Sequence, residues 1–105
     1  MKLDKYQERC VKTWLGDEIP EREHFMHMAM GLASEVGEFI GLVDKIEFKP
    51  SKKITPEMMI DELGDVFYYV VIAAHLLGIT IDELNEINAK KLKDGHGWID
   101  KLVAL

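Results

Sequence analysis

The chain has 105 residues, 48% of them hydrophobic, which is an ordinary size and composition for one soluble domain spanning residues 1–105. A net charge of −6 without a dominant basic stripe argues against nucleic acid as the main partner. The longest apolar run is shorter than the roughly 20 residues of a membrane span, and the charged start lacks the pattern of a signal peptide. The single cysteine, Cys10, cannot form an internal disulfide, so we expect a reducing cytoplasm.

Two amphipathic helices are expected in the first half of the chain. Residues 3–15 carry apolar side chains at helical spacing, and residues 22–46 form a longer helix after a loop. The second helix has one continuous apolar stripe, with Glu35 at its edge and Glu38 further round. The stripe consists of Phe25, Met28, Ala29, Leu32, Val36, Phe39, Ile40 and Val43.

A third helix is expected after a break at residues 47–55. Thr55 and Pro56 supply an N-cap and a first-turn proline, and the helix runs to Leu77 before Gly78. Its main apolar stripe consists of Met59, Ile60, Leu63, Val66, Phe67, Val70, Ala74 and Leu77. Three further residues share one flank of that stripe: Glu62, Asp65 and Tyr69. We expect the two stripes to form a core that the acidic residues border.

A capping box, Thr80-x-x-Glu83, opens a fourth helix over residues 81–93, and the following HGWIDKLVAL is expected to form a short helix or strap. No strand pattern of period two is present in the sequence. The predicted fold is therefore all-α and resembles a four-helix bundle. Because the third helix is apolar nearly all round, further helices or a second subunit must cover it, and we expect oligomerisation to complete the fold.

Two pairs of acidic residues stand out within the two central helices. Glu35-x-x-Glu38 and Glu62-x-x-Asp65 each place two carboxylates on one helix face, about one turn apart. An antiparallel helix hairpin would bring four negative charges together, and a hard divalent cation suits such an all-oxygen ligand set. The alternative is that both pairs simply decorate solvated helix faces, but two pairs embedded in apolar residues favour a metal site.

The metal is expected to be Mg²⁺, or alternatively Mn²⁺. A di-iron carboxylate bundle needs Glu-x-x-His in two helices, and this sequence has that spacing only at Glu21 and His24, away from both acidic pairs. Carboxylate-bound Mg²⁺ typically recruits substrate phosphates, and the matching chemistry is attack of water on phosphorus with a carboxylate accepting the proton. No Walker loop is present, so lysines and metal would have to hold the phosphates.

The paired acidic pattern resembles that of the MazG-like all-α nucleoside triphosphate pyrophosphohydrolases. The segments MGLASEVGEFIGLVDK and DELGDVFYYVVIAA are similar to the two acidic helices of that family, and ITIDELNEINAKKL is similar to the helix that follows. The resemblance implies a Mg²⁺-dependent enzyme that splits a nucleoside triphosphate into the monophosphate and pyrophosphate, and that cleans the nucleotide pool by acting on canonical or damaged nucleotides. It also implies a homodimer or homotetramer with sites near the subunit interfaces.

Site roles are carried over from this resemblance onto matching positions. The metal ligands would be Glu35, Glu38, Glu62 and Asp65, with Glu38 (or Glu35) orienting or deprotonating the attacking water. The residues implied in substrate binding are Trp14, Lys45, Tyr69, Asn88 and Lys91. The chain departs from many relatives where Lys93-Asp94-Gly95-His96 replaces an Arg followed by Tyr-Pro, which leaves the substrate range open. The alternatives are a phosphoribosyl-ATP pyrophosphohydrolase and a non-catalytic helical module that binds Mg²⁺ or mediates dimerisation.

Overall fold

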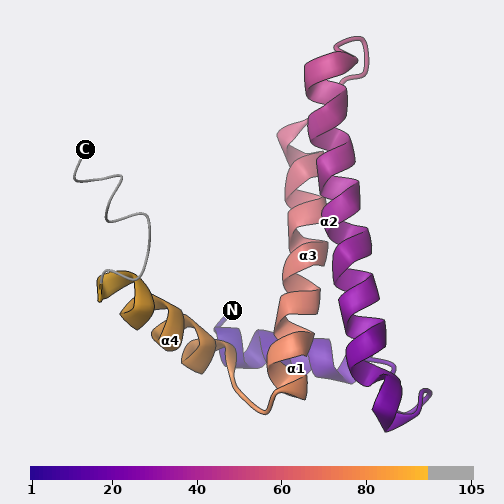
Figure 1. The fold of residues 1–105 in the computed structure, drawn as a ribbon. Helices are drawn as coiled ribbons and strands as arrows, with labels where there is room; N and C mark the ends of the chain where they lie inside the picture. The colour runs from indigo at the N-terminus through magenta and orange to yellow at the C-terminus, as the bar shows by residue number, and fades with distance from the viewer. Residues whose placement is uncertain (95–105) are drawn as a thin grey trace.

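Four α-helices make up the part of the chain, residues 1–94, that the structure, a computed structural model, describes (Figure 1). They are α1 (Leu3–Thr13), α2 (His24–Phe48), α3 (Pro56–Leu76) and α4 (Ile81–Lys93), and a 3₁₀ turn, η1 (Glu21–Glu23), leads into α2. No strand occurs among these residues, which confirms the predicted all-α fold and the order of its helices. The expected C-terminal helix or strap lies outside the described residues.

The helices α2 and α3 form a long antiparallel hairpin, and the other two helices gather at its base. Figure 1 shows α1 crossing near the C-terminal end of α3, while α4 leaves that end and runs away from the hairpin. The helix α4 contacts α1 and α3 but not α2. Within residues 1–94, the upper part of the α2–α3 hairpin therefore has no covering helix.

Local sequence signals fix where α3 and α4 begin. The Thr55 hydroxyl accepts a hydrogen bond from the Met58 N–H (3.2 Å), with Pro56 in the first turn. At α4, the Thr80 hydroxyl and the Glu83 side chain each accept a hydrogen bond from the other residue's backbone N–H, completing the predicted capping box. Between them, Gly78 has φ of +77°, a conformation that glycine adopts without steric cost.

The core lies where α1, α3 and the start of α4 meet. Its fully or nearly fully buried residues are Cys10, Val71, Ile72, Ala74 and Ile81. Gln7 ties the α3–α4 connection to α1: its amide donates to the Ile79 carbonyl (3.1 Å) and accepts from the Ile81 N–H (3.3 Å). This clamp satisfies backbone groups of a buried turn, which would otherwise lose hydrogen bonds to water.

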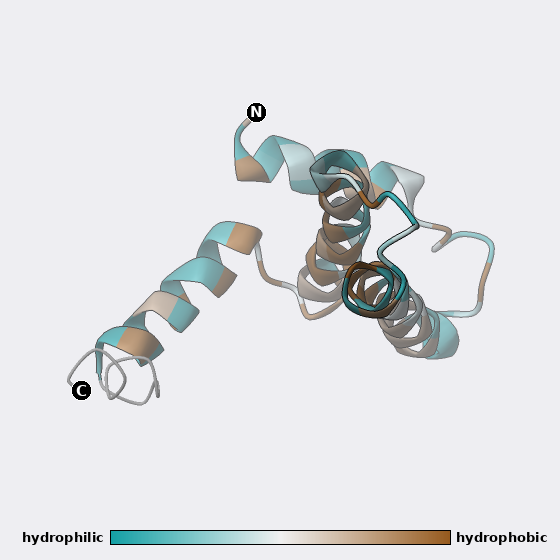
Figure 2. Cartoon of the chain, turned by 90° about the horizontal axis from the view of Figure 1, so that it is seen from above, coloured by the Kyte–Doolittle hydropathy of each residue, from teal (hydrophilic) through white to brown (hydrophobic). Residues whose placement is uncertain are grey.

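The helix faces that meet in the hairpin differ from the predicted apolar stripes. Glu35 and Glu62, expected at the border of the core, lie at the α2–α3 contact and are half-buried. In contrast, Ile40 and Ile60, expected in the core, are 58% and 67% exposed. The other large residues of the two predicted stripes that are exposed are Phe25, Val36, Val43, Leu63, Phe67 and Leu77. The predicted core is wrong at these positions because α3 is apolar nearly all round and α2 also has apolar residues outside the packed face, so hydrophobicity alone does not select which face packs (Figure 2).

None of the helices within residues 1–94 is by itself long and apolar enough to cross a membrane. By length and composition alone, α3 and α4 meet that requirement only as a pair, and they are bent by 96° at the break between them.

Candidate metal centre

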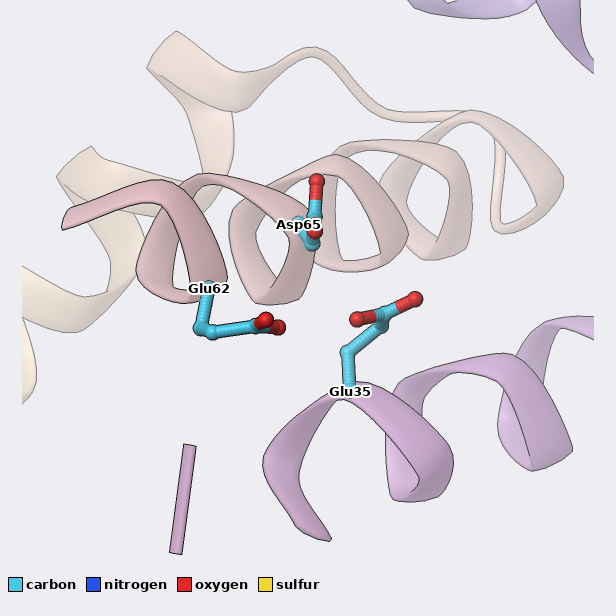
Figure 3. Close-up of side chains that lie close together, drawn as sticks. All are labelled: Glu35, Glu62 and Asp65. Carbon is cyan, nitrogen blue, oxygen red and sulfur yellow. The ribbon is translucent and has the colours of Figure 1, made fainter. Parts of the chain in front are cut away.

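Carboxylates from both hairpin helices converge about midway along α2 and α3. Glu35 projects from α2 and Glu62 and Asp65 project from α3 into the same space (Figure 3). One oxygen atom from each of the three carboxylates can be chosen so that all lie within 4.8 Å of one another. The predicted meeting of the two acidic pairs across an antiparallel hairpin is therefore present for these three residues.

Burial makes this cluster unfavourable without a counter-charge. Asp65 is exposed, but Glu35 and Glu62 are half-buried, and one carboxylate oxygen of each (Oε2) is inaccessible and has no hydrogen-bond partner. A buried polar atom without a partner loses its hydration without compensation, and this loss is larger for a charged group. The two oxygens need either a proton or a cation.

The proton affinity of the cluster reflects the same crowding. Desolvation, followed by the nearby Glu38, Asp65 and Glu35 carboxylates, raises the pKa of Glu62 from 4.5 to about 7. Desolvation and the neighbouring Glu38 and Asp65 charges also raise the pKa of Glu35. In the metal-free protein the cluster therefore retains protons at pH values where isolated carboxylates have lost them.

Glu38, the fourth predicted ligand, lies at the edge of this cluster. It is exposed and does not belong to the group of three whose oxygens lie within 4.8 Å. It is nevertheless close enough to raise the pKa of both Glu35 and Glu62. Glu38 thus borders the site from the solvent side of α2.

Tyr69 lies next to the carboxylates, and its ring packs against α2 at Gly31. A Cβ atom placed on Gly31 would come within 2.2 Å of the Tyr69 ring, so only glycine leaves room for the ring there. Burial, followed by the Glu35 charge, raises the pKa of the Tyr69 phenol. The structure thus places the predicted Tyr69 beside the acidic cluster and reveals Gly31, whose role the sequence left open, as the residue that accommodates it.

Comparison with protein families agrees with this geometry. The family model described as the MazG nucleotide pyrophosphohydrolase domain matches residues 23–99, which include α2, α3, α4 and all four acidic residues. The chain belongs to the MazG nucleotide pyrophosphohydrolase family. No curated protein and no solved structure matches the chain.

Not every residue predicted to bind substrate lies near the acidic cluster. Trp14 lies at the base of the hairpin, where its ring meets that of His24 edge-on at 6.3 Å between centroids. Because His24 precedes Glu35 by eleven residues, about 16 Å of helix separates this aromatic pair from the cluster. Trp14, His24 and Leu76 line a separate cavity of about 280 Å³ there.

The remaining predicted substrate-binding residues fall into two groups. Lys45 is exposed on α2, two turns beyond Glu38. Asn88 and Lys91 lie on α4, which runs away from the hairpin and has no contact with α2 (Figure 1). Within one chain, the structure therefore leaves Asn88 and Lys91 apart from the acidic cluster.

The residues present fit a divalent cation. The donors are carboxylate oxygens, the ligand type that Mg²⁺ and Mn²⁺ prefer, and no histidine or cysteine joins the group found among the described residues. The two buried oxygens without hydrogen-bond partners are the atoms that a cation would satisfy. We found no such signal in the sequence beyond the spacing of the acids, because burial of single atoms depends on how the helices are rotated.

Proposed function

We propose that this MazG domain is a Mg²⁺-dependent enzyme that hydrolyses a nucleoside triphosphate to the monophosphate and pyrophosphate, with a role in nucleotide-pool cleaning. The observation that carries the proposal is the meeting of Glu35, Glu62 and Asp65 within 4.8 Å, with two buried oxygens that have no hydrogen-bond partner. In a chain of this family, such a cluster supports a catalytic rather than a structural role. The single buried Cys10 is compatible with a reducing cytoplasm as its compartment.

Four carboxylates would hold the cation, with Glu35, Glu62 and Asp65 nearest and Glu38 at the rim. When bound, Mg²⁺ or Mn²⁺ supplies positive charge that offsets the negative charge of the phosphates and polarises their oxygens. The protein's own contribution is to fix the carboxylates from two rigid helices, so that the ligand set is preorganised.

Glu38 is the residue that we assign to the attacking water, with Glu35 as the alternative. Glu38 is exposed at the edge of the cluster, so a water molecule can reach it without crossing the core. Its carboxylate would orient the water and accept its proton, while the water oxygen bonds to phosphorus and the α–β anhydride bond breaks. The electron pair of that bond leaves with one product, and the accepted proton is later released to solvent.

Substrate contacts are proposed for the residues on either side of the acidic cluster. Tyr69, which lies beside the cluster, would contact the sugar or the nucleobase, and the exposed Lys45 would contact the phosphates. Trp14 would contact the nucleobase only if the substrate extends toward the end of the hairpin where α1 packs. Asn88 and Lys91 would act from α4 of a second subunit, since α4 of the same chain does not approach α2.

The proposal is tested by replacing single carboxylates with their amides. Glu35→Gln and Asp65→Asn should each lower pyrophosphate release by at least about 100-fold, because each removes a charged ligand with little change of shape. Asp61→Asn is the matched control, since Asp61 is exposed on α3 outside the cluster. Substantial turnover by either cluster variant would overturn the assignment.

The substrate class is tested by a screen of pyrophosphate release in Mg²⁺. Normal and modified ribonucleotides and deoxyribonucleotides are compared with phosphoribosyl-ATP. Cleavage of at least one nucleoside triphosphate supports the proposal. If only phosphoribosyl-ATP is cleaved, it is the substrate in place of a nucleoside triphosphate. If no compound is cleaved, the domain is a non-catalytic module.

A further inference from the structure

Three consecutive aromatic residues of α3, Phe67, Tyr68 and Tyr69, follow Asp65 within little more than one helical turn. Successive side chains of an α-helix point about 100° apart, so the three rings leave α3 in different directions. Tyr69 contacts α2 at Gly31, and the other two residues contact α1. Two different helices therefore hold α3 directly beside the acidic cluster.

Phe67 packs against the ring of Tyr6 on α1. The two rings are stacked, with 5.6 Å between their centroids and 10° between their planes. Such an aromatic pair contributes about 0.5–1.5 kcal/mol beyond the burial of its area. Burial, followed by the nearby Cys10, Tyr68 and Asp65 side chains, raises the pKa of the Tyr6 phenol to about 12. Tyr6 thus lies within electrostatic reach of a carboxylate of the cluster.

Tyr68 contacts α1 through its hydroxyl group. The Thr13 hydroxyl donates to the Cys10 carbonyl (2.8 Å), so its oxygen accepts the hydrogen bond from the Tyr68 hydroxyl (2.9 Å). Thr13 follows Tyr6 by seven residues, which places the two on nearly the same face of α1, about 10 Å apart. α1 therefore contacts α3 at two separate points.

These contacts oppose rotation of α3 about its own axis, and the acidic cluster is sensitive to that rotation. A carboxylate oxygen of Glu62 or Asp65 lies about 5–6 Å from the helix axis, so a rotation of about 10° moves it by about 1 Å. Mg²⁺ demands near-ideal octahedral geometry, and functional sites need their ligands within about 0.5 Å of it. A small rotation of α3 is enough to weaken the site.

We propose that Tyr6 and Thr13 of α1 are positioning residues for the metal centre. By holding Phe67 and Tyr68, they fix the rotation at which α3 presents its carboxylates to α2. This inference rests on the metal centre of the proposed function and adds α1 to it. Because α1 lies before residues 23–99, which the MazG family model matches, the match itself gives these two residues no role.

Binding of Mn²⁺ to the full chain without nucleotide, followed by electron paramagnetic resonance, tests this role. Binding that Glu62→Gln abolishes is assigned to the cluster. The double variant Tyr6→Leu with Tyr68→Phe should weaken it about tenfold, the lower end for residues that orient metal ligands. Tyr68→Phe alone should weaken it about threefold, and Tyr6→Phe, which keeps the stacked ring, should leave it unchanged. The control is Leu84→Ala, which removes packing from the same core on α4.

Affinities are compared at a temperature where circular dichroism shows each protein to be folded. A double variant that binds Mn²⁺ as tightly as Leu84→Ala would overturn the inference, and so would a wild type that binds no Mn²⁺ at the cluster. If the double variant does not fold, wild-type affinity in Tyr68→Phe would overturn it instead. Failure of the proposed function looks different, because Mn²⁺ would then bind as expected while no nucleoside triphosphate releases pyrophosphate.

Discussion

At the scale of single residues, Gly31 and Gly37 on the same helix illustrate two different uses of glycine. A Cβ atom at Gly31 would lie within 2.2 Å of the Tyr69 ring, whereas nothing lies within 4 Å of one at Gly37. Glycine weakens a helix interior by about 1 kcal/mol relative to alanine, so only Gly31 has a packing reason to be present. The residue is part of the site because it allows Tyr69 to lie against the helix that carries Glu35.

Gly31→Ala should therefore destabilise the protein by about 1–3 kcal/mol, since Tyr69 must move to relieve the overlap. Gly37→Ala is the matched control and should stabilise it by up to about 1 kcal/mol. Urea unfolding of the two variants measures both effects. A gain in stability for both variants would show that Tyr69 does not occupy the space above Gly31.

The acidic cluster should make the stability of the metal-free protein depend on pH. Because the pKa of Glu62 rises from 4.5 to about 7 on folding, the folded state binds more protons than the unfolded state between these values. Stability should then fall as pH increases from about 4.5 to about 7, and remain lower above that range. Melting temperatures measured in a chelator across this range should show the decrease, and Glu62→Gln should reduce it.

Mg²⁺ should oppose this loss of stability at higher pH. Since only deprotonated carboxylates bind the cation, the increase in melting temperature on adding Mg²⁺ should be larger near pH 8 than near pH 5. An equal increase at both pH values, or an unchanged increase in Glu62→Gln, would contradict binding at this cluster.

At the scale of helices, the sequence predicted where α3 and α4 begin and end, placed the ends of α1 and α2 within two residues, and did not predict how the helices are rotated. Thr55, Pro56, Gly78 and Thr80 mark boundaries through local hydrogen bonds and backbone geometry, and the structure has α3 and α4 within one residue of the predicted limits. Local chemistry is sufficient for such features. The i,i+3 spacing likewise predicted that four carboxylates would meet, and three of them, Glu35, Glu62 and Asp65, do so, while Glu38 lies outside the group.

Rotation could not be predicted because it depends on contacts between distant segments. Ile40 and Ile60 belong to the strongest apolar stripes, yet they are exposed, and Glu35 and Glu62 occupy the contact between the helices. A helix that is apolar on most of its surface offers more than one face for packing. The same uncertainty explains why the sequence did not reveal that Gly31, among the glycines of α2, faces Tyr69.

The side chain of Gln7, on α1, holds the connection between α3 and α4 by two hydrogen bonds. Its amide bridges the Ile79 carbonyl and the Ile81 N–H across the α3–α4 connection, and Gln7 itself is buried. Gln7→Ala should destabilise the protein by about 1–3 kcal/mol, because it leaves these two backbone groups without partners. Glu8→Ala, at the exposed next position, is the control for urea unfolding. Equal stability of both variants would show that the clamp contributes little.

At the scale of the whole molecule, the part of one chain that the structure describes is more open than a compact globular unit. Its solvent-accessible surface is 8244 Å², whereas a compact monomer of 12.0 kDa exposes about 6,000 Å². Its radius of gyration is 16.8 Å, against about 13 Å for a compact domain of this length. The difference in surface is comparable to what a large, permanent interface buries.

We therefore propose that a second copy covers the exposed stripes of α2 and α3, as the sequence led us to expect. Sedimentation equilibrium should give a dimer or tetramer at micromolar concentration. Ile40→Glu and Ile60→Glu should dissociate or unfold it, because each puts a charge on an apolar stripe that is exposed in the single chain. Asp44→Lys, at an exposed polar position of α2, should leave the assembly intact. A wild-type monomer at all concentrations would contradict this proposal.

The central claim is that the α2–α3 carboxylates form the metal centre of a nucleoside triphosphate pyrophosphohydrolase. The most direct test is to identify the products by phosphorus NMR after incubating the full chain with Mg²⁺ and the best substrate of the screen. We expect monophosphate and pyrophosphate in equal amounts, with no products in a chelator or with Glu35→Gln. Nucleoside diphosphate with orthophosphate, or the same products from Glu35→Gln, would contradict it.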